Sequence, residues 1–561
     1  MLSKRLFLLL IVVMLATLLA GCATQTPQIV EKIVEKPVEK IVKETVEVEV
    51  TKVVQATPVP PSATAKTFTV AWVSTDVSSF DPHMCASTDC LNFMRNVYES
   101  LVGYKYGTTE IEPQLAESWK VSDDGLAWTF TLREGLKFAD GSPVTSADVI
   151  YSCDRLSGME KGPALYLGGV YAGAEAVDDR TVTIKLSKVM GPFLSMVPRI
   201  FIVNSKVVKE QATTDDPWAE KWMYDHEAGS GPYVLEEWEH GVKMSVVKNP
   251  NYWDPTRPWS VERFRVLFIA ERATDQLMLE KGEIDQLQFP VIDLIPNYQA
   301  NPDFVVGLHD SFKGMNIMMN ANVPPLNDVR VRKAISLAFD YQAIIDGVFM
   351  GYAVQGQGPI SRKMRYHDDT LPIYKQDIEA AKALLAEAGY PGGGFDLEIV
   401  VITGYTPWVS SAQVLQQSLA QIGIDLKIVE MPWTQMAARG QNRDNPLQIY
   451  VINEFASYPD PDSTFSISYH TSQQEVGWNL SFYGNEETDA LIDKGRFSID
   501  PAEREAAYKE LQKRIFDDHA AIWMVNEQVV SVRRSWVKSY EYDPTWHETY
   551  RADLVVLEGK P

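Results

Sequence analysis

The sequence predicts a mixed α/β fold with more than one domain, and three observations support this. Residues 112–151 contain two alternating strands and two tight turns. Residues 378–430 instead alternate helix with strand, the pattern of a doubly wound sheet. The chain has 561 residues, far too many for one compact core. We therefore expect two or three domains once the N-terminal segments are set aside.

The first 22 residues have the pattern of an export signal. Lys4 and Arg5 precede the apolar run Leu6–Ala20, which suits a signal peptide and is short for a membrane span of about 20 residues. The run ends at Leu19-Ala20-Gly21-Cys22, which resembles a bacterial lipobox. That resemblance implies cleavage before Cys22 and lipidation of its thiol. The alternative is an ordinary signal peptide or anchor helix with a chance cysteine.

Residues 23–66 form a low-complexity segment. Ile-Val-Glu-Lys occupies 29–32 and 33–36, and prolines cluster at 58–61. A four-residue repeat does not keep one apolar stripe on a helix, and clustered prolines favour extended chain. We expect a tether between lipid and domain, with a short self-associating stalk as the alternative.

The stretch 112–151 predicts a hairpin followed by a helix. Asp123-Asp124-Gly125 separates the two strands, a second turn lies at 140–143, and a serine or threonine within 145–148 caps the helix. The expected buried face of the second strand is Trp128, Phe130 and Leu132. No catalytic group is placed here.

The net charge and the cysteines of the chain disfavour some kinds of ligand. The formal net charge is −23, which disfavours nucleic acid and gives no sign of a polyanionic ligand. In an oxidising extracellular setting, Cys85 and Cys90 can close a small loop. A metal site is the weaker alternative, because no paired histidine or second Cys-x-x-Cys accompanies them. Cys153 is expected to be a buried apolar residue.

The sequence contains none of the common catalytic motifs. The histidines form no His-Glu-x-x-His and no close pair, and there is no Gly-x-Ser-x-Gly, phosphate loop or Gly-x-Gly-x-x-Gly. His470 is the best-placed histidine for holding a nickel chelate. We expect no enzyme activity, no cofactor and no resident metal.

Further motifs follow one another along almost all of residues 67–561. In order they are Phe80–His83, Asn96–Val102, 112–151, Gly229–Leu235, Lys248–Trp253, Gly282–Asp285, Pro325–Ile335 and Ala381–Tyr390. Their order and spacing resemble the extracellular solute-binding proteins of family 5, the oligopeptide, dipeptide and nickel class. Members of this family are the capture subunits of ATP-driven importers.

The resemblance implies a two-lobed clamshell of the periplasmic-binding-protein type II class, with an additional third domain (cluster C type). We place lobe I at 67–98, 204–309 and 526–561, the additional domain at 99–203, and lobe II at 310–525. Most motif residues then have structural roles. Asp328–Arg332, for example, is expected to cap and pair at a helix start.

The resemblance also places the ligand between the lobes. In peptide-binding members, an aspartate two residues before a proline-rich turn pairs with the free amine of the peptide. Here that position is Ser457, and the tryptophan usual three residues earlier is Glu454. A buried ammonium without a carboxylate lacks a charge-assisted hydrogen bond and carries a desolvation cost. Either Glu454 supplies the charge, or the ligand has no free amine, as in an oligosaccharide.

Other residues complete the predicted ligand site. Trp433 matches a position where the family often has an aromatic pocket wall, which suits a sugar ring or an apolar side chain. Tyr458 lies in the same turn as Ser457. The loop after His83 adds Met84, Ala86 and Thr88. Trp408, Phe465 and Trp478 are expected to pack rather than to contact ligand.

The predicted function is capture of a small polar solute for ABC importer permease subunits. A peptide is the first expectation and an oligosaccharide the runner-up. The protein is expected to be a monomer, lipid-anchored on the outer face of the cytoplasmic membrane or in the periplasm. The alternatives from other classes are a surface-anchored hydrolase acting on peptides or glycans, and an adhesin.

Overall fold

The structure is a computed structural model. It describes residues 66–560, apart from Thr75, Ala86, Gly168, Ala270, Glu541 and 547–549, together with a short strand β1 (Lys52–Val53). The predicted signal, Cys22 and almost all of the predicted tether lie outside the described residues. Within the described part of the chain, no helix is both long and apolar enough to cross a membrane.

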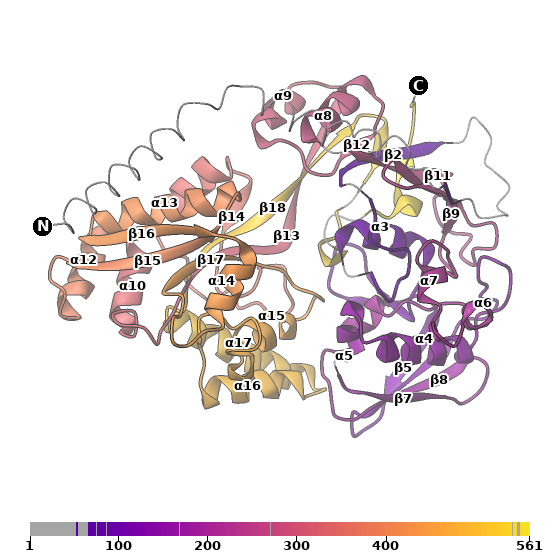
Figure 1. The fold of residues 1–561 in the computed structure, drawn as a ribbon, viewed down its shortest axis with the longest axis horizontal. Helices are drawn as coiled ribbons and strands as arrows, with labels where there is room; N and C mark the ends of the chain where they lie inside the picture. Colours follow the sequence, from indigo (N-terminus) through magenta and orange to yellow (C-terminus); the bar gives the residue numbers. More distant parts are fainter. Residues whose placement is uncertain are drawn as a thin grey trace, which may run out of the picture. The chain divides into compact units, whose positions relative to one another are not determined.

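Three separate stretches of chain build the sheet of the predicted lobe I. β2 (Thr67–Val73) pairs in parallel with β11 (Arg263–Ile269) and with β12 (Gln286–Leu287), and β12 pairs antiparallel with β18 (Ala521–Arg534). β9 and β10 continue the sheet beyond β11 (Figure 1). The remaining bounds are β9 (Tyr233–Glu239), β10 (Lys243–Lys248), β19 (Val537–Ser539), β20 (Val556–Leu557), α3 (Thr88–Val97), α6 (Ser205–Gln211), α7 (Glu220–Met223), α8 (Arg272–Lys281) and α9 (Ile295–Gln299).

Side-chain bonds hold the C-terminal stretch against α3. The Tyr550 N–H donates to Asn92 Oδ1 (2.7 Å), and Asn96 donates to the Tyr550 carbonyl (2.7 Å). Arg95 and Asp543, both buried, pair at 2.8 Å. Residues 448 positions apart in sequence therefore share one core.

The predicted additional domain contains a hydrophobic cluster, which Tyr458 also joins, and a four-stranded antiparallel sheet in the order β5–β6–β8–β7. β5 (Ala116–Val121) and β6 (Ala127–Leu132) confirm the predicted hairpin, and the expected face of β6 is buried. α4 (Ser146–Met159) confirms the predicted helix, with Thr145 and Asp148 forming its capping box. The other elements are β3 (Val102–Tyr104), β4 (Ile111–Pro113), β7 (Tyr171–Ala176), β8 (Thr181–Leu186) and α5 (Phe193–Met196).

The Phe80–His83 motif has a structural role. The Asp81 carboxylate accepts two bonds from the Arg155 guanidinium on α4, at 2.8 and 2.6 Å, and both side chains are fully buried. The His83 Nε2–H donates to the Phe201 carbonyl at 2.9 Å. Burial lowers the pKa of His83 to about 4, so this histidine stays neutral. The motif ties the opening of the predicted lobe I to the additional domain.

The predicted lobe II contains the expected alternation of helix and strand. β15 (Phe395–Ile402) pairs in parallel with β16 (Ile424–Met431) and with β17 (Ile449–Glu454), and α13 (Thr406–Ala420) connects β15 to β16. α13 begins at Thr406, and Pro407 fits its first helical turn. The other elements are α10 (Val329–Ala338), α11 (Tyr341–Ala343), β14 (Ala353–Gln355), α12 (Ile378–Glu387), α14 (Trp433–Gly440), α15 (Asp462–Ser468), α16 (Glu486–Arg496) and α17 (Pro501–Asp517).

Two long strands join the two parts of the main sheet. β13 (Phe304–Met319) lies antiparallel to β18 along most of its length (Figure 1). The pairing changes register between Asp310 and Gly314. β12 flanks β18 at one end of this ribbon, and β17 flanks β13 at the other. The domain boundaries given above stay a prediction.

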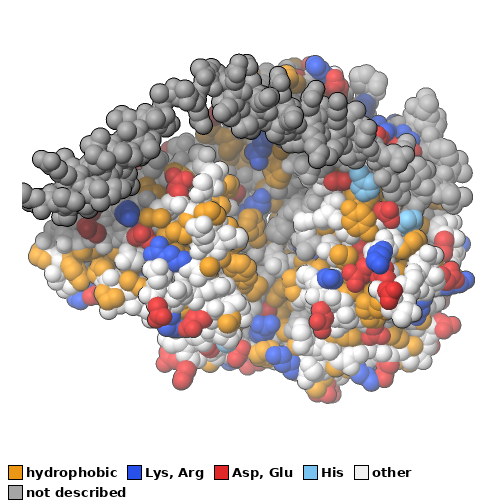
Figure 2. Space-filling model, in the orientation of Figure 1, with side chains coloured by type: hydrophobic (Ala, Val, Ile, Leu, Met, Phe, Trp, Pro, Cys, Tyr) orange, Lys and Arg blue, Asp and Glu red, His pale blue; other side chains and the backbone are white. Residues whose placement is uncertain are grey.

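The structure also confirms the predictions about the cysteines and about Asp328. Cys85 and Cys90 form a disulfide, and Cys153 is buried, which raises the pKa of its thiol to about 12. Asp328 caps α10 by accepting the Arg330 N–H at 2.8 Å, as predicted. Figure 2 shows acidic and basic side chains interspersed over the face in view.

Candidate functional site

A small pocket lies where β17 ends in the predicted lobe II. Its volume is about 180 Å³. Its walls come from β17, the loop after it and α15, with Trp478 at one side. The lining residues are Met318, Tyr450, Ile452, Asn453, Glu454, Phe455, Ser457, Ser463, Thr464, Ile467, Ser468 and Trp478.

The alternation of a strand explains how β17 builds this pocket. Side chains two residues apart project from the same face of a strand. Tyr450, Ile452 and Glu454 share one face in this way, and all three line the pocket. β17 is held in place by pairing with β13, where Gly314 stands opposite Glu454.

Glu454 is the acidic group of the pocket. The Tyr469 hydroxyl lies 3.4 Å from its Oε1 and donates to it. Loss of water around the half-buried carboxyl raises the pKa of Glu454 to about 8. In the unliganded pocket the group is therefore mostly protonated at neutral pH. A cation at hydrogen-bond distance would favour the carboxylate, so the pocket is suited to an ammonium group.

An exposed aromatic surface adjoins this acid. The rings of Trp433 and Trp478 stack with centroids 5.5 Å apart and an interplanar angle of 19°. They are 38% and 45% exposed, so a broad apolar face remains open to a ligand. Phe455 is 50% exposed beside them, with the Lys313 ammonium 6.0 Å from its ring centroid. The arrangement offers a planar apolar contact next to a carboxyl group.

The other predicted site residues take different positions. Ser457 lines the pocket with Glu454, whereas Trp433 contributes by stacking on Trp478. Tyr458 is 4% exposed and packs in the core of the additional domain, and its hydroxyl donates to Asp462 at 2.6 Å. Met84 is half-buried just before Cys85 and is not a lining residue, Ala86 lies outside the described residues, and Thr88 begins α3.

Two aromatic residues pack as expected, and one does not. Phe465 is fully buried, and buried Trp408 donates its Nε1–H to Asn453 at 2.9 Å. Trp478 lines the pocket instead of packing in the core. The prediction also missed Tyr450 and Tyr469. The alternation along β17 was a signal for Tyr450, whereas Tyr469 reaches Glu454 from beyond α15 and left no local signal.

Residues of the predicted additional domain contact residues of the predicted lobe II around Gly191. The Gly191 N–H donates to the Arg496 carbonyl at 2.7 Å, and the Lys188 ammonium sits 4.7 Å from the Phe497 ring centroid. A Cβ at Gly191 would lie 2.1 Å from the Ser498 carbonyl oxygen, so no side chain fits there. We call residues 188–191 against 496–499 the Gly191 contact.

The described residues include no group of three or more His, Cys, Asp or Glu side chains arranged to hold a metal ion. His470 Nδ1 accepts the Ser472 N–H at 3.0 Å and so caps a short turn.

The chain is similar to known proteins in sequence and in structure. Residues 110–475 match the model of the bacterial extracellular solute-binding proteins, family 5 Middle. The probable D,D-dipeptide-binding periplasmic protein of Escherichia coli K12 is 30% identical over 504 residues, covering 89% of this chain and 96% of that protein. The glutathione-binding protein of Salmonella typhi is 30% identical over 485 residues, covering 84% and 91%.

A solved structure shows the same fold. It is the ABC transporter-associated periplasmic binding protein of Helicobacter pylori in complex with the peptide STSA, with a TM-score of 0.70 and 26% identity, covering 88% of this chain and 98% of that one. The fold is thus the two-lobed type II binding-protein fold with an additional domain, and the role is solute binding outside the cytoplasm. The chain belongs to the bacterial extracellular solute-binding proteins, family 5.

Proposed function

We propose that this protein captures a peptide between its lobes, with the peptide ammonium at Glu454, and delivers it to an ABC importer. The observation that carries the proposal is a desolvated carboxyl beside an exposed tryptophan pair. The peptide ammonium favours the ionised form of Glu454 and pairs with it, and the first side chain of the peptide lies on the rings. The D,D-dipeptide, glutathione and STSA in the names of the proteins compared above support the peptide class.

An oligosaccharide is the second candidate, because the open faces of Trp433 and Trp478 also suit a sugar ring. The remaining rivals are a surface-anchored hydrolase and an adhesin. Incubating the purified protein with peptides and oligosaccharides separates these classes. We expect a stoichiometric complex without turnover, and turnover without a stable complex would contradict the binding role.

Mass spectrometry of ligand that co-purifies with the protein tests the ligand class. Calorimetry then compares dipeptides with their N-acetylated counterparts, which lack the ammonium. We expect the acetylated forms to bind at least about 30-fold more weakly, or about 2 kcal/mol. Equal binding of both forms would rule out pairing at Glu454.

The affinity for peptide should depend on pH in a defined direction. Below a pKa of about 8, unliganded Glu454 must lose a proton before it can pair, so affinity rises from pH 6 towards pH 8. Above that range the peptide amine loses its own proton, at a pKa of about 7.7–8.0, and affinity falls. A flat profile across this range would contradict the pairing.

Closure of the lobes is part of the proposal. A ligand that touches both lobes favours the closed form. We propose that the closed form keeps the Gly191 contact seen in this structure. The lobes are proposed at 67–98, 204–309 and 526–561, and at 310–525. Small-angle scattering should show a smaller radius of gyration with ligand, and an unchanged radius at saturation would contradict closure.

Anchoring and assembly belong to the same proposal. The mature protein begins at lipidated Cys22, is carried by the tether 23–66, and acts as a monomer on the outer face of the cytoplasmic membrane or in the periplasm, without a cofactor. Intact mass of the membrane-extracted protein checks the lipid, and light scattering checks the monomer. A Cys22→Ser variant that stays membrane-bound would contradict the anchor.

A further inference from the structure

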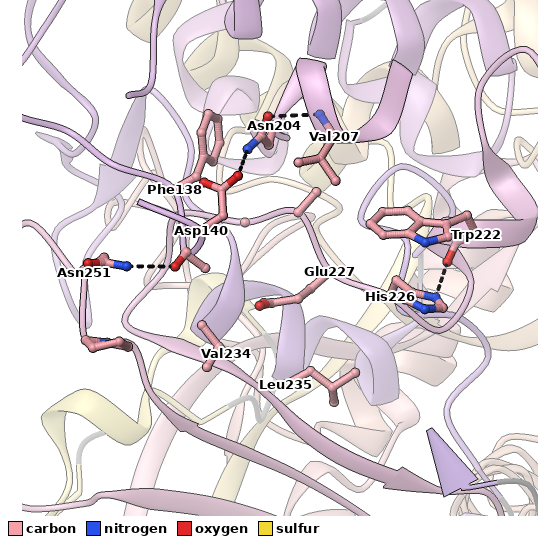
Figure 3. Close-up of a pocket in the computed structure, with 14 residues that line it drawn as sticks. Phe138, Asp140, Asn204, Val207, Trp222, His226, Glu227, Val234, Leu235 and Asn251 are labelled. Carbon is pink, nitrogen blue, oxygen red and sulfur yellow. Dashed lines mark hydrogen bonds between the residues drawn. The ribbon is translucent and has the colours of Figure 1, made fainter. Parts of the chain in front are cut away.

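A second pocket lies apart from the Glu454 pocket. Its volume is about 400 Å³, and no residue of 310–525 lines it. Its walls come from the turn at 138–140, α6, the end of α7 with the loop after it, the start of β9 and residues 250–251 (Figure 3). Pockets that hold small ligands in proteins have volumes of about 300–1,000 Å³.

Glu227 is the polar group that this pocket leaves incompletely bonded. One carboxyl oxygen accepts the Leu235 N–H, whereas Oε2 is buried and has no hydrogen-bond partner among the described residues. A buried polar atom without a partner costs about 1–3 kcal/mol, and more if it is charged. Figure 3 shows the Glu227 side chain extending into the space between Asp140 and Val234. Because Glu227 also lines the pocket, its carboxyl group is the acidic group nearest to an occupant.

The charges around Glu227 are acidic. Asp140 lies at the rim, where Asn204 donates to its Oδ2 at 3.1 Å and the Ser142 N–H to its Oδ1 at 2.9 Å. In the part of the chain that the structure describes, the ion pairs join no lysine or arginine to Glu227 or Asp140, and His226 pairs with Asp225 at 2.6 Å. A cation is the occupant that these carboxyl groups favour.

The rest of the lining suits an apolar body. Trp222 stacks on His226 with ring centroids 4.7 Å apart, and Phe138 and Val234 add buried apolar surface. Aromatic faces also attract organic cations. The described residues show no set of three or more ligands for a metal, so an organic cation fits better than a metal ion.

We propose that this pocket is a second binding site, for a small organic amine whose ammonium pairs with Glu227 and whose apolar part lies against Trp222. The proposal stands apart from the proposed peptide capture, because none of the residues that line this pocket lines the Glu454 pocket.

Proton release gives this site a distinctive signal. Burial and the nearby Asp140 raise the pKa of Glu227 to about 8, so the empty site is mostly protonated at pH 7. A bound ammonium favours the carboxylate, and each binding event then releases close to one proton. Asp140, Asp225, His226 and the Tyr98 hydroxyl also face this region, so the source of the proton must be isolated by mutation.

Calorimetry with 2-phenylethylamine tests the proposal, with 2-phenylethanol as its neutral counterpart. Titrations at pH 7 in two buffers of different ionisation enthalpy measure the released proton. We expect the amine to bind at least about tenfold more tightly than the alcohol. Glu227→Gln keeps the acceptor for Leu235, and should lose about tenfold in amine affinity together with the proton release. Glu558→Gln, at an exposed position, should change neither.

Asp140→Asn provides a second variant, and a smaller loss of amine affinity, about threefold, is expected from it. Three results would overturn the proposal: no amine binding at millimolar concentration, equal binding of amine and alcohol, or loss of amine binding in Glu454→Gln with none in Glu227→Gln. The last result would place the amine in the Glu454 pocket. Peptide binding that survives in Glu227→Gln keeps the two sites distinguishable.

Discussion

Glu454 and Glu227 are two half-buried acids with the same raised pKa, about 8, and the same main cause, loss of water. Their surroundings differ. Glu454 stands beside an exposed tryptophan pair in lobe II, and the Tyr469 hydroxyl supports it. Glu227 is bonded by a backbone N–H and faces Asp140 in a pocket lined by lobe I and the additional domain. A raised pKa therefore marks a group that awaits a partner, and the neighbouring surface decides which partner fits.

The largest expected effect separates the two acids by their ligands. Glu454→Gln should weaken peptide binding by about 2–5 kcal/mol, because the peptide ammonium is then buried without a carboxylate. Calorimetry with the co-purified ligand measures this loss. Glu227→Gln should leave peptide affinity unchanged. Equal losses in the two variants would show that the two pockets act as one.

The second prediction is a change in folding stability that should be the same for both acids. A carboxyl group whose pKa rises from 4.5 to about 8 on folding holds its proton more tightly when folded, so stability falls as pH rises between these values. Glutamine has no such dependence. Allowing for partial exposure, each Glu→Gln variant without ligand should be more stable than the parent by about 1–3 kcal/mol at pH 8.

Urea unfolding at two pH values checks this. The stability difference should disappear near pH 4, because there the carboxyl group of the parent is mostly protonated in both the folded and the unfolded state. A variant less stable than the parent at pH 8 would mean that the carboxylate already has a partner in the unliganded protein.

A smaller effect on peptide binding is expected from a substitution at the Gly191 contact. This contact belongs to the proposed closure around Glu454 and not to the Glu227 pocket. Gly191→Ala places a methyl group against the Ser498 carbonyl and should weaken peptide binding by about 1–2 kcal/mol, because the Gly191 contact is lost. Amine binding should be unaffected. Gly347→Ala is the matched control, since a Cβ there meets no atom within 4 Å. Titrating both variants with peptide measures the difference in affinity. Identical affinities would show that the Gly191 contact plays no part in closure.

The smallest effect concerns the aromatic surface. Trp433→Ala should cost a peptide about 0.5–1.5 kcal/mol, because Trp478 still offers a ring. Titration with peptides that differ in their first side chain measures it. A loss larger than that of Glu454→Gln would favour the oligosaccharide instead.

The parts of the fold predicted from sequence are those set by local rules. Asp123–Gly125 makes a turn wherever alternating strands flank it, and Thr145 with Asp148 caps a helix without help from distant residues. The parallel pairing of β15 with β16 follows from the helix between them. Glu454 is singled out because the resemblance places a tryptophan at its position, and its role as a ligand contact stays a prediction.

The residues that escaped prediction depend on distant packing. Tyr458 was placed in the ligand site, but its environment is the core of a domain more than 250 positions earlier in the sequence. Trp478 reaches the pocket because it stacks on Trp433. The Glu227 pocket joins Asp140 to Asn204, 64 positions apart, and no local pattern indicates their contact.

The ribbon of β13 and β18 is expected to limit how the proposed lobes move. Two hydrogen-bonded strands resist stretching and in-plane bending, but flex out of their plane where the pairing is interrupted. In this ribbon the pairing shifts register between Asp310 and Gly314 and again between Met315 and Asn316, close to the Ser311 hydroxyl that donates to the Glu527 carbonyl at 2.6 Å. We therefore expect the ribbon to bend most easily within residues 310–316. In the proposed closure, we therefore expect ligands of different length to meet the same closing motion, with side-chain rotation in the pocket accommodating their differences.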